Sequence, residues 1–280
     1  MKPVIYTPDS PLRRPVNMIA EFFREIVSLR ELIWALFVRD IKAQYRQSFF
    51  GYLWIIAPAV ATSAAWFFLN SQGIVRVEET KMPYAIFVLV GQVLWGAFST
   101  SLLMPLSAFQ ACRPVVMKLK VAPEAFLIAS LGKIFFDLFV RVLFLILILL
   151  IFGIGFSWGS LIFLPILLAL CWLGMAIGLF FVPVGSLFQD IGQALTMLVP
   201  FAMFLTPVVY PAPEEGFAGA LMTWNPVAPF VEAGRDWLIF GQAGYSELII
   251  GLFISSIFLS IAGFLVLRVV RPRLIERMGM

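Results

Sequence analysis

Histidine is absent from the chain of 280 residues, and cysteine occurs only twice, at Cys112 and Cys171. The absence of histidine excludes histidine-based acid and base catalysis, a Ser-His-Asp triad and most transition-metal sites. Cys112 falls in a predicted cytoplasmic loop and Cys171 in a predicted membrane span, where an oxidising environment is lacking. We therefore predict two free, structural cysteines and no metal site.

Charged residues are also scarce. They make up 13% of the chain, whereas hydrophobic residues make up 61% and the mean hydropathy is +0.98. Soluble domains contain about 25% charged and about 45–50% apolar residues, so this composition predicts an integral membrane protein. The first 15 residues carry charges and prolines but no apolar stretch of about 7–15 residues, so we expect no signal peptide and a cytoplasmic N-terminus.

Six apolar segments are each long enough to cross about 30 Å of hydrocarbon as a helix. They predict an all-α membrane protein with six transmembrane helices and both termini on the same side. On that side, residues 1–51, 111–133 and 268–280 contain 16 Lys and Arg residues, and Lys133 at the start of the third span is counted with them. On the other side, residues 71–83, 153–160 and 211–246 contain 3. Because basic residues are retained in the cytoplasm, both termini are predicted to be cytoplasmic. The predicted spans are residues 52–70, 84–110, 126–152, 161–184, 194–211 and 247–267.

Two further segments are apolar but do not fit a simple span. Residues 17–49 place charged side chains every three or four positions opposite apolar ones, which predicts an amphipathic helix pair on the membrane surface. A capping-box pattern at Ser28 predicts the start of the second helix. Residues 211–246 contain short apolar pieces around four prolines, which predicts re-entrant helices before the last span. The predicted organisation is a cytoplasmic extension with the interfacial helix at 1–51, a transmembrane domain at 52–267 and a cytoplasmic tail at 268–280.

The third predicted span contains the only ionisable residues expected inside the membrane. Asp137 precedes Arg141 by four positions, which is the favourable order for an ion pair within one helix, and Lys133 lies one turn earlier. Intramembrane charges are often functional, so a proton or ion relay is one interpretation. No other carboxylate or histidine continues such a relay, which favours a pair that neutralises itself inside the bundle.

The loop after the second predicted span is basic. Residues 112–123 predict a short helix with Pro114 at its first position, which projects into the cytoplasm and docks on a soluble subunit. The alternative is an ordinary basic loop that only sets the topology. No Gly-x-x-x-x-Gly-Lys-Ser/Thr motif occurs, so any ATP must be bound by a partner. The residues assigned to docking are Arg113, Pro114, Lys118 and Lys120.

Five segments in order resemble the permease subunits of bacterial type 2 ABC exporters of polysaccharides, the family of the O-antigen, capsule and teichoic-acid transporters. The segment RDIKAQYRQSFFGYLWIIAP resembles the first motif of that family. The segments CRPVVMKLKVAP and QDIGQAL resemble two of its cytoplasmic loops. The other two are FLTPVVYP, which resembles the end of the fifth span, and NPVAPFVEAGRDWLIFG, which resembles the re-entrant region.

This resemblance implies a homodimer of multi-pass subunits in the bacterial inner membrane, with two separate nucleotide-binding ATPase subunits beneath it. The chain would be a transport subunit rather than an enzyme, with ATP and magnesium in the partner and no cofactor of its own. The implied substrate is a polysaccharide, O-antigen-like, built on undecaprenyl diphosphate. Membrane lipids are the other expected partners, and no nucleic acid is expected.

The resemblance also directs attention to two sets of residues. Arg39, Lys42 and Arg46 share one face of the interfacial helix at head-group depth, where they either meet a lipid diphosphate or only hold the helix on anionic lipid. The family places the first and fifth spans at the conduit, where flat aromatic rings would let a sugar chain slide. The aromatic residues predicted there are Trp54, Phe67, Phe201, Phe204 and Tyr210.

Other classes of protein share part of this pattern. A membrane-embedded glycan-processing enzyme would be expected to carry carboxylate clusters at a membrane face, whereas the only acidic cluster here lies outside. A secondary transporter would be expected to show an inverted repeat and buried carboxylates. Capsular polysaccharide or teichoic-acid exporters, and type 2 permeases for drugs or small lipids, share the predicted architecture.

Overall fold

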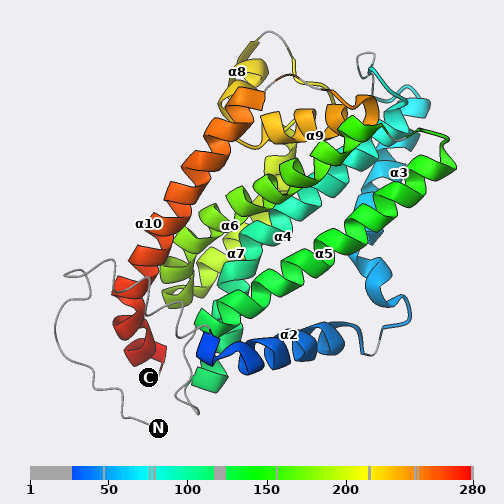
Figure 1. Ribbon diagram of the computed structural model, residues 1–280. Helices are drawn as coiled ribbons and strands as arrows, with labels where there is room; N and C mark the ends of the chain where they lie inside the picture. Colours follow the sequence, from blue (N-terminus) through cyan, green and yellow to red (C-terminus); the bar gives the residue numbers. More distant parts are fainter. Residues whose placement is uncertain are drawn as a thin grey trace.

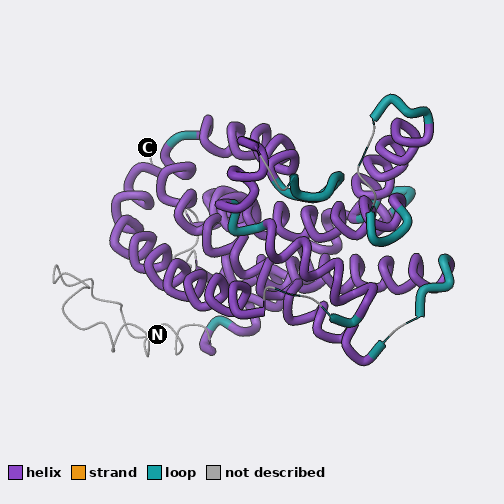
Figure 2. Tube along the Cα trace, turned by 90° about the horizontal axis from the view of Figure 1, so that it is seen from above, coloured by secondary structure: helices purple, strands orange, loops and turns teal. Residues whose placement is uncertain are grey.

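The computed structural model describes residues 27–46, 48–75, 77, 80–116, 124–155, 157–213, 216–242, 244 and 246–278 of the protein. That part of the chain is entirely helical, with nine α-helices, three short 3₁₀ segments and no strand. Figure 2 shows these helices joined by short loops. The prediction of an all-α protein is confirmed for the described residues.

Among the described residues, four helices are long and apolar enough to cross a membrane. They are α4 (Tyr84–Val116), α5 (Glu124–Ile151), α6 (Phe163–Leu187, preceded by the 3₁₀ segment η3, Trp158–Ile162) and α10 (Ser246–Met278). Their apolar stretches coincide with the second, third, fourth and sixth predicted spans. The structure therefore confirms four of the six predicted membrane helices.

The first and fifth predicted spans correspond to shorter helices. Residues 52–70 form η2 (Gly51–Ile55) and then α3 (Ala57–Ser71), which has 15 residues. Residues 194–211 overlap α7 (Gln189–Ala202), of 14 residues, and η4 (Met203–Leu205). At 1.5 Å per residue these helices are about 22 and 21 Å long, less than the 30 Å of hydrocarbon.

Proline explains both interruptions. Pro58 lies in the first turn of α3, where its missing N–H is tolerated, so the helix starts there instead of at residue 52. At the other interruption, Thr206 is extended and precedes Pro207, which disfavours a helical residue before it. The prediction of one continuous helix through 211 is therefore wrong.

Helix α4 is the centre of the bundle. In its most apolar window 72% of the residues are buried, against 28% for α5 and 22% for α10. It packs closely on Gly174 and Gly178 of α6. A side chain at either glycine would collide with a backbone carbonyl of α4. Small residues at such crossings let helix backbones approach in a membrane, where packing drives association. Gly263 gives α10 a similar contact with Leu179 and Phe180 of α6.

Helix α2 (Arg30–Tyr45) lies across one end of the bundle, near the end of α10 (Figure 1). It packs on the first turns of α5, where the ring of Phe37 lies over Gly132. The buried Leu36 lies on the same side, whereas the basic residues Arg39, Lys42 and Arg46 are exposed. A helix is therefore present where one was predicted, and its position on the membrane surface stays a prediction. The helix begins at Arg30 with no side-chain cap, so the capping box predicted at Ser28 does not start it. Residues 17–26 lie outside the described residues.

Two short helices occupy the opposite end of the bundle (Figure 1): α8 (Gly216–Trp224) and α9 (Ala228–Phe240). They confirm that residues 211–246 form short helices before α10. Helix α9 is packed into the core, where Phe230, Val231 and Ala233 are fully buried. It ends at Gly241, whose φ of +68° requires glycine and whose backbone lies against Gly159 of η3.

Candidate functional site

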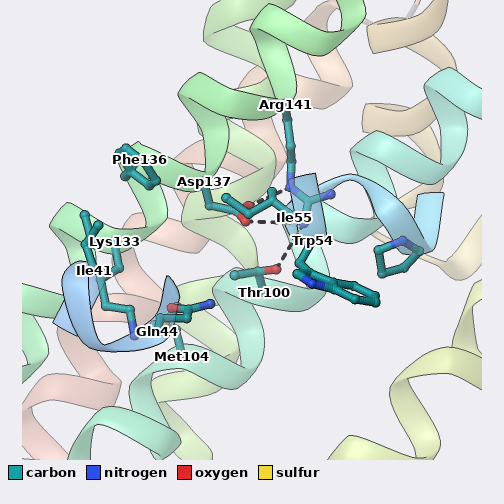
Figure 3. Close-up of a pocket in the computed structure, with 11 residues that line it drawn as sticks. Ile41, Gln44, Trp54, Ile55, Thr100, Met104, Lys133, Phe136, Asp137 and Arg141 are labelled. Atoms are coloured by element: carbon teal, nitrogen blue, oxygen red, sulfur yellow. Dashed lines mark hydrogen bonds and ion pairs between the residues drawn. The ribbon is translucent and has the colours of Figure 1, made fainter. Parts of the chain in front are cut away.

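A cavity of about 240 Å³ lies between α2, the start of the first predicted span, α4 and α5 (Figure 3). Four of its lining side chains are charged or strongly polar within an otherwise apolar bundle, namely Lys133, Asp137, Arg141 and Gln44. The remaining lining residues are Ile41, Trp54, Ile55, Pro58, Thr100, Met104 and Phe136. We refer to this space as the charged cavity.

An ion pair forms the wall of the charged cavity. The Nε of Arg141 donates to Oδ2 of Asp137 over 2.6 Å, and its Nη2 lies 3.5 Å from the hydroxyl of Thr100 on α4. Figure 3 shows the two side chains directed at one another. Gly96 of α4 makes room for the guanidinium, since a Cβ there would overlap Nη1 of Arg141. The pair predicted from the sequence is therefore present, and it links α5 to α4.

A second hollow, of about 720 Å³, lies between α4, α6 and α7. Its polar lining is uncharged and consists of amide and hydroxyl side chains. Gln110 closes one side by donating from Nε2 to the carbonyl of Gly185 over 3.1 Å. The lining residues are Leu103, Leu106, Ser107, Gln110, Gly185, Ser186, Gln189, Gly192, Gln193, Thr196 and Met197. We refer to this hollow as the neutral groove.

Sequence reasoning missed the neutral groove, although a signal was present. Gln189, Gln193 and Thr196 recur at intervals of four and three positions, which places them on one face of α7. Gln189 and Gln193 precede the predicted fifth span and only Thr196 lies within it, so the stripe continues from a predicted cytoplasmic loop into that span. Such a polar stripe indicates a surface that faces polar material rather than lipid. The apolar residues around the stripe hid it from an analysis based on hydropathy.

The three basic residues predicted to meet a lipid head group lie outside the charged cavity. Arg39 is exposed and donates to its neighbour Asp40 over 2.7 and 2.9 Å, and Lys42 and Arg46 are also exposed. Helix α2 instead contributes Ile41 and Gln44 to the cavity. Arg39, Lys42 and Arg46 thus form a basic outer face of α2.

The predicted conduit aromatics fall into two groups. Trp54 lines the charged cavity, whereas Phe67, Phe201 and Phe204 are exposed on α3, α7 and η4. Tyr210 donates its hydroxyl to the carbonyl of Phe204. The ring of Phe204 lies 6.2 Å from that of Trp66, so it brings α3 and η4 together. Trp54 is the only one of the five that lines either hollow.

The predicted docking loop is only partly within the described residues. The backbone of α4 continues through Arg113 and Pro114 to Val116, so the separate helix predicted to begin at Pro114 is wrong. A proline inside a helix removes one backbone hydrogen bond, which the long, well-packed α4 tolerates near its end. The side chains of Arg113 and Pro114, and all of Lys118 and Lys120, lie outside the described residues, so their docking role stays a prediction.

Arg235 of α9 was not singled out from the sequence. Its side chain is 3% exposed, and its guanidinium donates to the carbonyls of Pro207 and Val208 over 3.0 and 3.1 Å. It also lies 3.5 Å from the ring centroid of Phe87, which gives a cation–π contact. Gly91 leaves space for it on α4, since a Cβ there would lie 2.5 Å from Nη2. Arg235 therefore connects three elements, namely α9, the segment that follows η4, and α4.

Long apolar helices with two polar hollows between them and a basic helix across one end have the architecture of a multi-pass membrane protein. Residues 31–239 match the family of ABC-2 type transporters. Since the match covers most of the chain, the protein belongs to this family and is a transport subunit rather than an enzyme, as the sequence predicted.

Three relatives illustrate the similarity. The O-antigen export system permease protein RfbA of Klebsiella pneumoniae is 23% identical over 252 residues, covering 89% of this chain and 95% of that protein. A protein of the same name from Myxococcus xanthus is 26% identical over 212 residues, covering 73% of this chain and 78% of that protein. The polysialic acid transport protein KpsM of Escherichia coli is 25% identical over 211 residues, covering 72% and 79%.

Proposed function

We propose that the chain is the channel-forming membrane subunit of an ATP-driven exporter, which moves an O-antigen-like polysaccharide linked to undecaprenyl diphosphate across the bacterial inner membrane. The observation that carries this proposal is the similarity, along most of the chain, to permeases named for O-antigen export. A capsular polysaccharide is the second candidate substrate, because the polysialic acid transport protein is similar over a comparable length. A teichoic-acid chain, which is linked by charged phosphates, stays a further alternative.

The neutral groove supports a sugar substrate. The sugars of a neutral polysaccharide present many hydroxyl groups and no charge, and amide and hydroxyl side chains can exchange hydrogen bonds with them in either direction. The groove holds six such side chains and no ionised one. A substrate chain can therefore move past it without breaking a strong charge-assisted hydrogen bond.

The proposed assembly is a homodimer with two nucleotide-binding subunits. Helices α3 and α7 expose large apolar side chains such as Phe67, Phe68, Met197 and Phe201, which are available to a second copy and to a conduit between the copies. We propose that Trp54, Phe67, Phe201, Phe204 and Tyr210 contribute to that conduit. The end of α4 and the loop after it, with Arg113, Pro114, Lys118 and Lys120, would contact the ATPase.

Transport itself can be measured with purified components. The chain and its ATPase partner would be placed in proteoliposomes that contain undecaprenyl-diphosphate-linked O-antigen in the outer leaflet. ATP should drive the glycan into the lumen, where it becomes resistant to an added glycosidase. Equal protection of the glycan in the absence of ATP would contradict the proposed function. Transport of drugs or short lipids without transport of the glycan would contradict it as well.

ATP hydrolysis is expected only in the presence of the partner subunit, because the chain has no phosphate-binding loop. Replacing Arg113, Lys118 and Lys120 together by glutamate should reduce co-purification of the two subunits by about tenfold, since each repulsive contact opposes docking. The measurements are ATPase rate and pull-down yield. Unchanged values would show that these residues only set the topology.

The proposed topology places both termini in the cytoplasm and α8 outside. A cysteine at Trp224, which is 87% exposed, should react with a membrane-impermeant thiol reagent in intact spheroplasts. The variant would lack Cys112 and Cys171, and a cysteine at Lys42 on α2 is the matched control, which should react only after lysis. The reverse labelling pattern would place the bundle the other way round in the membrane.

The basic outer face of α2 is expected to meet the diphosphate of the lipid carrier, rather than only to hold the helix on anionic lipid. Each basic residue at head-group depth contributes about 1 kcal/mol to the attraction of an anionic head group, so Arg39→Gln combined with Arg46→Gln should reduce export about tenfold or more. The protein should stay in the membrane and assembled, because both side chains are exposed. Export is measured as the amount of polysaccharide that reaches the cell surface. A normal amount in the double variant would refute the role of Arg39 and Arg46 in binding the head group.

A further inference from the structure

The charges that line the charged cavity do not cancel. Asp137 is bound to Arg141 at 2.6 Å, which neutralises both. Lys133 also lines the cavity and forms no ion pair with any residue that the structure describes. The cavity therefore carries one positive charge in excess.

The position of Lys133 indicates a function. It lies within an apolar stretch of α5, in a helix long enough to cross the membrane. A charged side chain within such a helix is unfavourable in lipid, and those that occur usually face a cavity and serve a function. Lys133 is partly buried and borders the cavity. An anionic ligand in the cavity would compensate its charge.

The size and the donors of the cavity limit what this ligand can be. A volume of about 240 Å³ is below the roughly 300–1,000 Å³ of sites that enclose a drug-sized molecule, so only a small group fits. Besides Lys133, the lining offers the amide of Gln44, the hydroxyl of Thr100 and the guanidinium of Arg141. Ammonium and guanidinium groups with neutral donors beside them are the usual partners of a phosphate.

In the proposed topology the cavity lies near the cytoplasmic end of the bundle, close to the head groups of the inner leaflet (Figure 1). Its floor is Ile41 and Gln44 of α2, the helix that crosses the end of the bundle, and its side is Trp54 and Ile55 before the first predicted span (Figure 3). Both elements carry apolar surface that is exposed, including Leu53 and Trp34, and that can contact acyl or prenyl chains. A phosphate inside the cavity could therefore stay attached to a lipid tail outside it.

We infer that the charged cavity binds the phosphate group of a membrane lipid, with Lys133 as its main counter-ion. The ion pair with Asp137 fixes the guanidinium of Arg141 at the wall of the cavity, so a phosphate meets a preorganised donor beside Lys133. This site is separate from the exposed basic face of α2. The identification of its lipid as the carrier of the exported glycan rests on the proposed function, whereas the phosphate site does not.

Farnesyl diphosphate is a suitable probe, since it carries a diphosphate on a short prenyl chain. Titrated into the purified full-length protein in a neutral detergent, it should bind, and Lys133→Gln should raise its dissociation constant at least tenfold. Lys133→Arg should keep the dissociation constant within about threefold of the unaltered protein. Lys81→Gln is the matched control: this exposed lysine lies before α4 at the other end of the bundle, and its loss should leave binding unchanged.

Further ligands identify the source of the phosphate. Inorganic diphosphate should bind much more weakly than farnesyl diphosphate, and equal affinity would overturn the assignment to a lipid. If phosphatidylglycerol displaces bound farnesyl diphosphate as effectively as further farnesyl diphosphate does, the result would support a lipid phosphate site. The same result would contradict the assignment of this lipid as the carrier of the glycan. Equal affinities of the Lys133→Gln and Lys81→Gln variants would overturn the site altogether. Binding that depends on Lys133 in a protein that exports no polysaccharide would contradict only the proposed function.

Discussion

Replacing Asp137 by asparagine is expected to lower the free energy of unfolding by about 3 kcal/mol, because it leaves the buried guanidinium of Arg141 without its counter-ion. The side chains of the pair are only 16% and 7% exposed, so water compensates little of the loss. The nearby ammonium of Lys133 adds repulsion once the carboxylate is gone. The measurement is denaturant-induced unfolding of the purified protein in detergent micelles.

Two further variants make this prediction specific. Asp137→Leu combined with Arg141→Met should be far more stable than Asp137→Asn, because it removes both charges and leaves neither buried alone. Asp40→Asn is the control, since the pair of Arg39 and Asp40 is exposed and its loss should change stability by less than about 1 kcal/mol. A double variant as unstable as Asp137→Asn would show that the charges are needed for more than mutual neutralisation, as in an ion relay.

Gly91→Ala is expected to have a destabilising effect of similar size. The new Cβ would lie 2.5 Å from Nη2 of Arg235 and would overlap the carbonyl of Val208, so a backbone or a buried arginine must move. Overpacking a close contact costs about 1–3 kcal/mol, and each displaced hydrogen bond from the guanidinium adds about 1.5–3 kcal/mol. We expect a total loss of about 3 kcal/mol or more, measured as the midpoint of thermal unfolding in micelles.

Gly251→Ala provides the matched control for this loss. Gly251 also lies in a long membrane helix, α10, but no atom lies within 4 Å of a Cβ built there. Since alanine is the better helix former, by up to about 1 kcal/mol, this variant should be as stable as the unaltered protein or slightly more so. Equal midpoints of thermal unfolding for the two variants would show that the packing around Arg235 accommodates the added methyl group without loss of stability.

The sequence predicted the long elements well because hydropathy is summed over about 18 residues or more. The apolar stretches of α4, α5, α6 and α10 are uninterrupted, and all four were predicted. The first and fifth predicted spans failed where prolines intervene. A hydropathy average does not show that Pro58 and Pro207 restrict the backbone conformations allowed around them.

The sites were less predictable because they depend on contacts between distant elements. The ion pair of Asp137 and Arg141 lies within one helix, so its spacing revealed it. The charged cavity joins residues of α2, α4 and α5, and no local pattern connects Gln44 with Thr100 or Lys133. Arg235 was counted as a topology signal, because its carbonyl partners lie 27 and 28 positions earlier in the chain.

The short helices α3 and α7 have a consequence for the surrounding bilayer. In the proposed topology both helices cross the membrane, yet their helical parts reach only about 21–22 Å. Lipid next to them must compress to avoid exposing polar backbone, and such hydrophobic mismatch costs a fraction of a kcal/mol per Å. A bilayer that is locally thinner beside the conduit shortens the hydrocarbon layer that a hydrophilic chain must cross. The thickness of the host membrane thereby becomes part of the transport barrier.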